Sequence, residues 1–484
     1  MSSKIGFQQS FVNSLPDCYV DAEALRFADP QLVYFNQQYA NELKASWPES
    51  DAELAKLFAG QQLPEDAKPI AQAYAGHQFG HFNPQLGDGR AMILGELELD
   101  SGKLTELDLK GSGPTPFSRG GDGKAALGPM LREVLIAEAM HALNIPSTRS
   151  LAVVSTGEVV YRDPPQPGAV LARTASSHIR IGTFQFFAAR DQYDVVEKLV
   201  QFCIQRHYPH LLSSATPALS LLDAVIDAQA KLVASWMGVG FIHGVMNTDN
   251  MLISAETIDF GPCAFMDTYD PNTVFSSIDR NSRYAYSNQP GVTLWNISRL
   301  AETLLPLIDE DKEKAIELAT KVVQSFSEKY ELAIRIKMSE KLGLSATASD
   351  SELDGVIKEW YELLQTQGVD WTLAHWHLEQ HIKSKDKHLF KLFKDETKLN
   401  DWLSKRERLT MSKFESFNEV NPAVIPRNHL VEEALDAATI KSDFSPFYAL
   451  LENLQTPFNL PNDLKYLYPA DTKFNDGYVT YCGT

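Results

Sequence analysis

The sequence is short of cysteine, of long apolar runs and of positive charge, and each shortage excludes a class of protein. Its four cysteines (Cys18, Cys203, Cys263 and Cys482) are scattered and form no C-x-x-C pair, so neither a zinc site nor a disulfide framework is expected. No window approaches the roughly 20 uninterrupted apolar residues that span a bilayer. The first residues lack the apolar core of a signal peptide, and the first arginine is Arg26, so we predict a cytoplasmic protein with no membrane partner.

Negative charge dominates the composition. The chain has 63 acidic and 44 basic residues, which gives a formal net charge of -19. This balance argues against nucleic acid as a partner, because phosphate backbones bind cationic surfaces. It does not argue against a nucleotide, which needs only a local cluster of arginine and lysine. With 484 residues, 44% of them hydrophobic, we expect a globular protein of two or three structural units.

The stretch FIHGVMNTDNMLISAETIDFG, which begins at Phe241, carries the clearest functional pattern. It predicts a polar loop, a short apolar strand (251–253), a turn and a second strand before the D-F-G sequence. In protein kinases, H-R-D-L-x-x-x-N followed by D-F-G supplies the Asn and the Asp that hold magnesium. Counted from His243, these two positions are Asn250 and Asp259. The spacing therefore predicts a kinase-like metal site.

The same stretch lacks the base that a kinase uses. That base lies two residues after the His, where this chain has Val245, and valine cannot accept a proton. The nearest carboxylate is Asp249, immediately before Asn250. The alternative is a buried turn in which Asp and Asn only cap backbone amides. If the pattern is functional, it predicts phosphate chemistry with Asp249 as the candidate base.

Two glycine-rich segments upstream could approach phosphates. Gly87-Asp88-Gly89-Arg90 precedes a run, 92–99, that alternates like a strand, although D-G is also a common turn dipeptide. The segment 111–128, GSGPTPFSRGGDGKAALG, is too rich in glycine for a regular element and predicts a loop in which Asp122 and Gly123 touch a nucleotide. A flexible polar loop with no ligand is the plain alternative.

A lysine and a glutamate can be paired across this segment. The strand predicted over 104–111, LTELDLKG, places Leu107 and Leu109 on one face and the side chains of Asp108 and Lys110 on the other, as in a half-buried strand. The residues 129–143, PMLREVLIAEAMHAL, predict a helix that starts at its proline and carries Glu133. Glu133 could reach Lys110 and fix its ammonium group where phosphates bind, as in kinases.

Two arginines complete the candidate cluster. Strands are predicted at 149–156, with a continuation to about 163, and at 168–187, and the second stretch carries Arg173 and Arg180 on either side of a Ser-Ser pair. Two guanidinium groups suit a triphosphate, although exposed arginines on strands are common. From residue 191 the pattern is helical, and the helix at 219–239 leads directly into the loop at 241–261. A largely helical tail follows residue 345.

Five features occur in a fixed order along the chain: the glycine-rich loops, L-D-L-K, the helix with R-E, H-G-V-M-N-T-D-N and I-D-F-G-P. With them, the chain resembles the selenoprotein O family, which includes the YdiU-type proteins of bacteria. The resemblance is dense from Tyr74 to about Trp295. It extends to the turn N-P-x-x-I-P-R-N at 421–428 and to the cysteine near the C-terminus, and so covers nearly the whole chain.

The resemblance implies a kinase-like fold that binds ATP in a flipped orientation and transfers AMP, rather than phosphate, to protein hydroxyls. Asp249 would be the base, and Asn250 and Asp259 would hold Mg²⁺, with Mn²⁺ and UTP as open alternatives. Some family members have selenocysteine near the C-terminus, where this chain has Cys482, and others pair a tail cysteine with one after D-F-G, where this chain has Cys263. The nucleotide would contact Gly87, Gly89, Arg90, Lys110, Asp122, Gly123, Glu133, Arg173, Arg180 and Asp259.

The expected architecture is an α+β, protein-kinase-like, two-lobed fold with a helical extension. We expect an N-lobe with an N-terminal extension at 1–190, a helical C-lobe at 191–345 and a helical extension at 346–484. The leading functional hypothesis is a protein adenylyltransferase whose partners are ATP and protein substrates. The alternatives are a phosphotransferase that uses Asp249 as its base and an inactive nucleotide-binding scaffold, which the valine at 245 would suit. The sequence specifies neither the acceptor proteins nor the oligomeric state.

Overall fold

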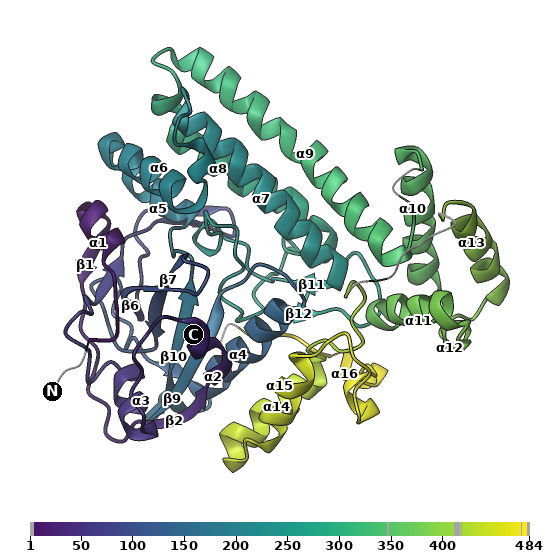
Figure 1. Cartoon of the computed structure of the whole chain (residues 1–484), viewed down its shortest axis with the longest axis horizontal. Helices are drawn as coiled ribbons and strands as arrows, with labels where there is room; N and C mark the ends of the chain where they lie inside the picture. Colours follow the sequence, from purple (N-terminus) through teal and green to yellow (C-terminus); the bar gives the residue numbers. More distant parts are fainter. Residues whose placement is uncertain (1–3, 346–347, 411–416, 418, 476, 482–484) are drawn as a thin grey trace.

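The computed structural model describes residues 4–345, 348–410, 417, 419–475 and 477–481 (Figure 1). The fold is mixed α+β with an antiparallel sheet. Figure 1 shows the sheet in the first part of the chain, with the long helices of the middle part on one side of it and further helices following. Cys482 lies outside the described residues.

The main sheet has the strand order β1-β3-β6-β7-β10-β9-β2, and β8 pairs with β10. Every pairing in it is antiparallel. Two smaller sheets pair β4 with β5 and β11 with β12. The strands are β1 (Tyr19–Asp21), β2 (Gln31–Phe35), β3 (Ile70–Gln72), β4 (Gly76–Gln78), β5 (His81–Asn83), β6 (Ala91–Glu98), β7 (Leu104–Lys110), β8 (Ala125–Ala126), β9 (Arg149–Val160), β10 (Gln166–Ala175), β11 (Phe241–Ile242) and β12 (Ala264–Phe265).

The strands predicted at 92–99 and 104–111 are confirmed as β6 and β7, but β7 is not half-buried. Leu107 and Leu109 lie in the core on one face, as expected. On the other face Asp108 and Lys110 are also buried, because charged partners cover them. The pleat therefore places two ionised side chains side by side in the interior, and both need compensation there.

Helix α4 (Leu127–Ala142) confirms the helix predicted at 129–143 and begins two residues earlier. It is buried along most of its length, because it contacts β9 and β10 on one side and α14 (Asn428–Lys441) and α15 (Ser445–Leu454) on the other. A helix covered on both sides is apolar nearly all round, as this one is. This packing holds the helix that carries Glu133 against the sheet that carries Lys110.

Of the next two strand predictions, one needs correction. The strand predicted at 149–156, with its continuation to about 163, is confirmed as β9, which ends at Val160. The strand expected over 168–187 ends at Ala175, and its last part is the helix α5 (Ile181–Ala188). An apolar run such as IGTFQFF has no periodicity that separates a buried strand from a buried helix, and tertiary packing decides between them. Arg180 therefore precedes a helix instead of lying in a strand.

The strand predicted at 251–253 is also wrong. This segment forms a single bridge between Leu252 and Arg180, with hydrogen bonds from Ile181 N to Met251 O and from Ile253 N to Ile179 O, both 2.9 Å. The expected second strand is likewise reduced to one bridge, between Thr257 and Ser147. Each segment meets its partner over too few residues to form a ladder.

The helices from Tyr193 onward confirm the helical pattern predicted after residue 191. Helix α7 ends at Val239 and is capped by Gly240, whose left-handed φ of 72° turns the chain into β11 and the loop that follows. None of the helices in the described part of the chain combines the length and apolar character needed to cross a membrane. The helices whose bounds are not given above are α1 (Ser10–Ser14), α2 (Gln37–Glu42), α3 (Asp51–Phe58), α6 (Tyr193–His207), α7 (Pro217–Val239), α8 (Gln289–Ile308), α9 (Lys312–Leu342), α10 (Asp350–Gln367), α11 (Trp371–Ser384), α12 (His388–Lys391), α13 (Glu396–Arg408) and α16 (Thr472–Asn475). Short 3₁₀ turns lie at Pro16–Cys18, Pro209–Leu211, Thr248–Asn250, Tyr286–Asn288 and Leu464–Tyr466.

The tail is tied to the segment after the D-F-G sequence by the turn at 421–428. Arg427 has no exposed surface and donates to Asp267 at 2.5 Å and to Asp370 at 2.7 Å. Its neighbour Asn428 donates to the carbonyl of Phe265 at 3.0 Å. These contacts give the turn a structural role that its sequence alone did not reveal.

Candidate active site

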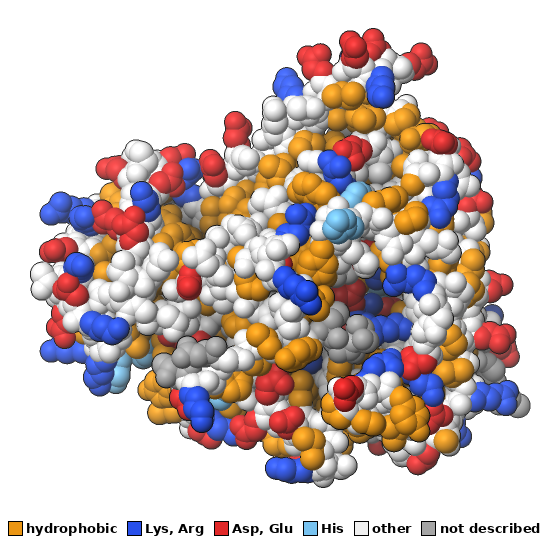
Figure 2. Space-filling model, turned by 180° about the vertical axis from the view of Figure 1, so that it is seen from behind, with side chains coloured by type: hydrophobic (Ala, Val, Ile, Leu, Met, Phe, Trp, Pro, Cys, Tyr) orange, Lys and Arg blue, Asp and Glu red, His pale blue; other side chains and the backbone are white. Residues whose placement is uncertain are grey.

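A cavity of about 580 Å³ lies between β7, α4, the glycine-rich loops and the loop after β11. Its size is within the range of small-molecule sites in proteins. Figure 2 shows the hollowed face of the molecule, where acidic and basic side chains lie close together inside the hollow. Each site residue singled out from the sequence lines this cavity: Gly87, Gly89, Arg90, Lys110, Asp122, Gly123, Glu133, Arg173, Arg180, Asp249, Asn250 and Asp259.

Lys110 and Glu133 form an ion pair inside this cavity. Lys110 is the last residue of β7, and Glu133 lies on the face of α4 that covers the sheet. The side chains are 6% and 4% exposed, so water screens the pair weakly. The Lys110 ammonium also donates to Oδ1 of Asp259 at 2.7 Å. It is thereby fixed between the helix and the loop that carries the D-F-G sequence.

Arg173 joins the same cluster from β10. Its Nη1 donates to Oδ1 of Asp259 at 2.8 Å and to Oε2 of Glu133 at 3.3 Å. Its Nε and Nη2 both donate to Oδ2 of Asp108, at 3.1 and 2.8 Å. Burial alone would raise the pKa of Asp259, but Lys110 and Arg173 outweigh it and hold that pKa well below its usual range.

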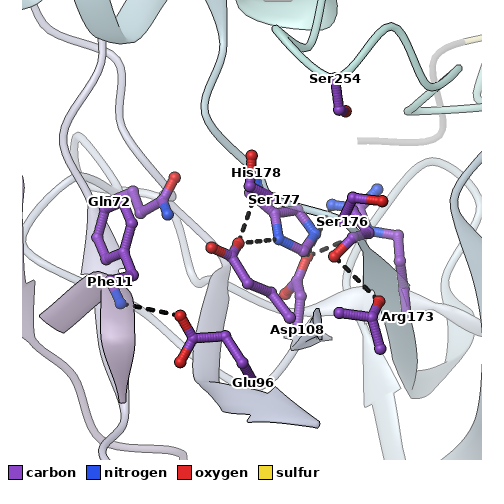
Figure 3. A network of polar contacts seen from close by, with 12 residues as sticks. Phe11, Gln72, Glu96, Asp108, Arg173, Ser176, Ser177, His178 and Ser254 are labelled. Atoms are coloured by element: carbon purple, nitrogen blue, oxygen red, sulfur yellow. Dashed lines mark hydrogen bonds and ion pairs between the residues drawn. The ribbon is translucent and has the colours of Figure 1, made fainter. Parts of the chain in front are cut away.

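A second layer of polar groups fixes Arg173 from behind (Figure 3). Figure 3 shows Asp108 between Arg173 and His178, with the imidazole Nε2 at 3.6 Å from Oδ2 of Asp108. The other ring nitrogen, Nδ1, donates to Oε2 of Glu106 at 2.8 Å. All four side chains are almost fully buried, so each depends on these partners for its compensation.

Arg180 has a separate anchor at the base of the first glycine-rich loop. Its Nη1 donates to Oδ1 of Asp88 at 3.1 Å, and its guanidinium lies 4.2 Å from the centre of the Tyr74 ring. The other oxygen of Asp88 accepts the backbone N–H of Gln72 at 2.9 Å. Stacking on the Tyr74 ring fixes the guanidinium of Arg180, and so fixes the directions of its remaining N–H donors.

The loop after β11 has an internal scaffold of its own. His243 Nε2 donates to the carbonyl of Ile258 at 2.9 Å, and burial lowers the pKa of this imidazole, so the ring is neutral. Asn250 Nδ2 donates to the carbonyl of Val245 at 3.0 Å, which turns the amide oxygen of Asn250 away from the loop. The D-F-G Asp259 has a left-handed φ of 63°, which is uncommon for a residue other than glycine.

Asp249 lies against the hairpin formed by β4 and β5. Gln78 Nε2 donates to its Oδ2 at 3.4 Å, and a Cβ on Gly76 would lie 2.7 Å from its Oδ1. Glycine at 76 is thus the residue that leaves room for the carboxylate. Oδ1 has no hydrogen-bond partner among the described residues. Burial raises the pKa of Asp249 to about 6, so the group can exchange a proton near neutral pH.

The glycine-rich loops pack against each other. Gly87 has a φ of 76°, and a Cβ there would lie 2.3 Å from Cγ of Phe117 in the second loop. Gly123 has a φ of 68°, and its Cβ would lie 2.1 Å from the backbone of Gly113. These glycines are required by the backbone path itself, whether or not a phosphate is bound.

Asp122 extends from the second glycine-rich loop toward solvent. It pairs with Arg162, which holds its pKa down at about 2. The charge of Asp122 is therefore already compensated by Arg162, which lies in the connection between β9 and β10.

Several residues that shape the site were not identified from the sequence. Tyr74 and Asp88 hold Arg180, Asp108 holds Arg173, and His178 lies beside Asp108. Asp108 carried a signal, since the alternation of β7 puts it on the same face as Lys110. Tyr74 and His178 carried none, because their contacts join segments far apart in the chain.

The segment after the D-F-G sequence is held by α4 and by the end of the chain. Arg132 donates to the carbonyls of Gly261 at 3.1 Å and Cys263 at 2.5 Å, and Thr480 donates to the carbonyl of Pro262 at 2.6 Å. Cys263 is buried and has no disulfide partner among the described residues, and burial raises the pKa of its thiol to about 12. A thiol in this state is a poor nucleophile.

Comparison with known proteins gives one family. The family described as "Protein adenylyltransferase SelO" matches residues 2–455. A protein of Cereibacter sphaeroides (strain KD131) is 50% identical over 482 residues, which is 99% of both chains. A protein of Chromobacterium violaceum is 50% identical over 465 residues, 94% of this chain and 97% of its own. One of Rhizobium johnstonii is 48% identical over 488 residues, 99% and 97% of the two chains. All three are named "Protein nucleotidyltransferase YdiU".

Proposed function

Because the chain belongs to the protein adenylyltransferase SelO family, we propose that it transfers the AMP unit of ATP to hydroxyl side chains of proteins. The acceptors are serine, threonine and tyrosine, and pyrophosphate is released. We extend the proposal to UTP as an alternative donor of UMP. The relatives' shared name supports a nucleotidyltransferase acting on protein, and the choice of nucleotide and hydroxyl rests on the site.

The observation that carries this proposal is that the usual kinase base is missing while another carboxylate is available nearby. Val245 occupies the position from which a kinase activates its substrate, and it cannot bind a proton. Asp249 has a carboxylate oxygen with no partner in the described part of the chain and a pKa raised to about 6. A base displaced from the usual position suits attack at a different phosphorus, the α-phosphorus of a nucleotide bound the other way round.

The arrangement of these residues supports a protein-kinase-like, two-lobed fold. A lysine at the end of a sheet strand pairs with a glutamate on the adjacent helix, and Asn250 and Asp259 face them from the loops after α7. We propose the N-lobe at 1–190, the helical C-lobe at 191–345 and the helical extension at 346–484. The cavity lies between the sheet and the helical part, where kinases bind their nucleotide.

Lys110, Arg173, Arg180 and Arg90 are the groups proposed to bind the phosphates. Three of them, Lys110, Arg173 and Arg180, pair with carboxylates that line or support the cavity: Asp88, Asp108, Glu133 and Asp259. The cluster is therefore nearly neutral before a nucleotide binds. A triphosphate would add about four negative charges, so its binding calls for additional cations.

A divalent metal fits this requirement, and Asn250 and Asp259 are the residues proposed to hold it. Asp259 uses Oδ1 for Lys110 and Arg173, which leaves Oδ2 for a metal, and the Asn250 amide oxygen is directed by the bond from its NH₂ group to Val245. No group of three or more His, Cys, Asp or Glu side chains suitable for a metal occurs among the described residues. Two protein oxygens completed by phosphate oxygens are the kind of site that Mg²⁺ uses, and Mn²⁺ can replace it.

When bound, the metal would neutralise the phosphates and withdraw charge from the attacked phosphorus. The chain's own residues supply the remaining steps. Asp249 Oδ1 accepts the proton of the acceptor hydroxyl, whose oxygen forms a bond to the α-phosphorus. The bond from that phosphorus to the bridging oxygen breaks, and pyrophosphate leaves with the electron pair. Lys110, Arg173 and Arg180 hold the leaving phosphates in place during this displacement.

A phosphotransferase that uses Asp249 as its base is the second candidate, because the same groups would also hold a γ-phosphate. An inactive scaffold would need no carboxylate with a raised pKa beside two candidate metal ligands. Incubation with ATP labelled at the α or at the γ position separates the three. Transfer of the α label with release of pyrophosphate is expected, with an added mass of roughly 329 Da instead of the roughly 80 Da of a phosphoryl group.

The variant Val245→Asp sharpens this test, because it restores the kinase base position. If the nucleotide is bound for attack at the α-phosphorus, the variant does not become an efficient kinase. Transfer of the γ label by the unaltered protein would refute the proposal. An unlabelled acceptor and an unlabelled enzyme, with each metal and nucleotide, would favour the scaffold.

A further inference from the structure

A second hollow adjoins the cavity and has no role in nucleotide binding as proposed above. It has a volume of about 770 Å³ and lies between the β4–β5 hairpin, the segment 278–283 and the start of α8. Phe79 and Ile278 line both hollows, so the two adjoin. We call this second hollow the hairpin groove.

The wall of the hairpin groove is bonded to the loop that carries Asp249. The backbone N–H of His77 donates to Thr248 Oγ1 at 2.7 Å, and that of Phe79 donates to Asn247 Oδ1 at 3.0 Å. The Tyr284 hydroxyl donates to the same Asn247 oxygen at 2.8 Å. The wall of the groove is therefore fixed relative to the loop that carries the candidate base.

The free charge of the hairpin groove is positive. Arg280 is exposed and Arg283 half-exposed, and neither forms an ion pair with any described residue. Nε of Arg283 is buried and has no hydrogen-bond partner in the described ranges, and the guanidinium lies 4.8 Å from the centre of the Trp295 ring. The carboxylate of Asp279 is already used, since it accepts the backbone N–H groups of Arg283 and Tyr284 at 2.9 and 2.8 Å.

Two unpaired arginines side by side are unexpected in this chain, which has a net charge of -19 and nearly three acidic residues for every two basic ones. Most acidic proteins are repelled by such a chain, so a local positive groove selects where an acidic segment can approach. Arginine also binds carboxylates in a two-pronged geometry, and a guanidinium stacked on an aromatic ring is held ready for it.

The groove also offers apolar surface beside these charges. Ile278, which lines the groove, is 49% exposed. Trp295 is packed edge to face against His77, with ring centres 5.2 Å apart, which keeps its position fixed. Large exposed apolar side chains next to a site commonly mark a surface that binds a partner.

We propose that the hairpin groove binds the acceptor protein, through an extended segment with an acidic side chain close to the hydroxyl that is modified. The carboxylate lies against Arg280 and Arg283, and a neighbouring apolar side chain covers Ile278. This inference rests on the proposed function, for which it names a class of substrate.

The test uses synthetic peptides with a single Ser, Thr or Tyr flanked by glutamate, glutamine or lysine and otherwise identical. Transfer from ATP labelled at the α position gives KM and kcat for each peptide. We expect the glutamate peptides to have a KM about tenfold or more below that of the lysine peptides, and the difference to shrink as salt is added. The variant Arg280→Glu with Arg283→Glu should reverse this order.

Two further variants separate charge from folding. Arg280→Glu alone changes an exposed residue with no ion pair, and should raise the KM of the glutamate peptides about tenfold while leaving kcat, the KM for ATP and self-modification unchanged. Arg408→Glu, at an exposed position at the end of α13, is the matched control and should change none of these values.

Three results would overturn the proposal. One is equal KM values for the three peptide series, or modification of none of them by an enzyme that modifies itself. Another is an effect of the arginine variants on the KM for ATP but not on that for the peptides, which would assign the groove to the nucleoside. The third is the absence of any nucleotide transfer by the unaltered enzyme, self-modification included. This result would refute the proposed function, and the groove proposal with it.

Discussion

Replacing Asp249 by asparagine should make the protein more stable at neutral pH while it removes most of the activity. The carboxylate is held in a position where burial raises its pKa from 3.8 to about 6. In the unfolded chain the group ionises near its ordinary pKa, so between about pH 4 and pH 6 the folded state binds more protons. The free energy of unfolding therefore falls as the pH rises through this interval, and stays lower above it.

The shift of about two pKa units corresponds to at most about 3 kcal/mol, since each unit is worth about 1.4 kcal/mol. The Asp249 side chain keeps some contact with solvent, so we expect about 1–2 kcal/mol in practice. Asparagine has the same shape and no charge, and so removes this cost. For a chain of this length the gain corresponds to a rise in Tm of roughly 1–3 °C.

The assay compares thermal unfolding of Asp249→Asn and the unaltered protein at pH 7.5 and at pH 4. The gain should be present at pH 7.5 and absent at pH 4, where both forms are neutral at this position. Asp122→Asn is a control of opposite sign, because Arg162 lowers the pKa of Asp122 to about 2 and its carboxylate stabilises the fold at neutral pH.

Activity should respond in the opposite direction. Loss of a general base typically costs about 10²–10⁴-fold, and transfer by the unaltered enzyme should fall below about pH 6 as Asp249 becomes protonated. An Asp249→Asn protein that is less stable at pH 7.5, or that transfers AMP at the normal rate, would refute the assignment of Asp249 as a desolvated base.

The remaining predictions concern charge and anchoring. Asn250→Ala and Asp259→Asn should each lower transfer by about 10³-fold or more in saturating Mg²⁺ while far-UV circular dichroism is unchanged, and normal turnover with a chelator present would contradict the metal role. Lys110→Ala should raise the KM for ATP about tenfold or more, measured with α-labelled ATP, and an unchanged KM would mean that Lys110 does not contact phosphate. Arg427→Met leaves Asp370 buried without its partner and should cost about 3–5 kcal/mol in urea unfolding, whereas a loss under about 1 kcal/mol would show that the pair is not structural.

The sequence was sufficient to identify many of the residues that line the cavity, because their motifs lie at fixed distances from elements with clear patterns. Lys110 follows from the alternation of β7, and Glu133 from the period of α4. The strand predicted at 251–253 failed because its partner, the segment 179–181, is remote in the chain and pairs with it over only a few residues. Local pattern cannot specify a contact of this kind.

The contacts that orient the arginines were also beyond sequence reasoning. Tyr74 packs on Arg180 across more than a hundred residues, and Arg427 pairs with an aspartate 160 residues earlier. Nothing in the local composition of either segment indicates its partner. Burial of charge is an outcome of the assembled fold, and it determines both the low pKa of Asp259 and the raised pKa of Asp249.

The bond from Thr480 to Pro262 joins residues 218 positions apart, and this separation has a consequence for synthesis of the protein. At about 5–20 residues per second, a ribosome adds Thr480 roughly 10–40 s after it has added Pro262. During that interval the segment beside Asp259 lacks one of the contacts that fix it. A nascent chain still attached to the ribosome therefore holds its candidate metal ligand next to an incompletely anchored loop, and it acquires the finished site only when the last helices have been made.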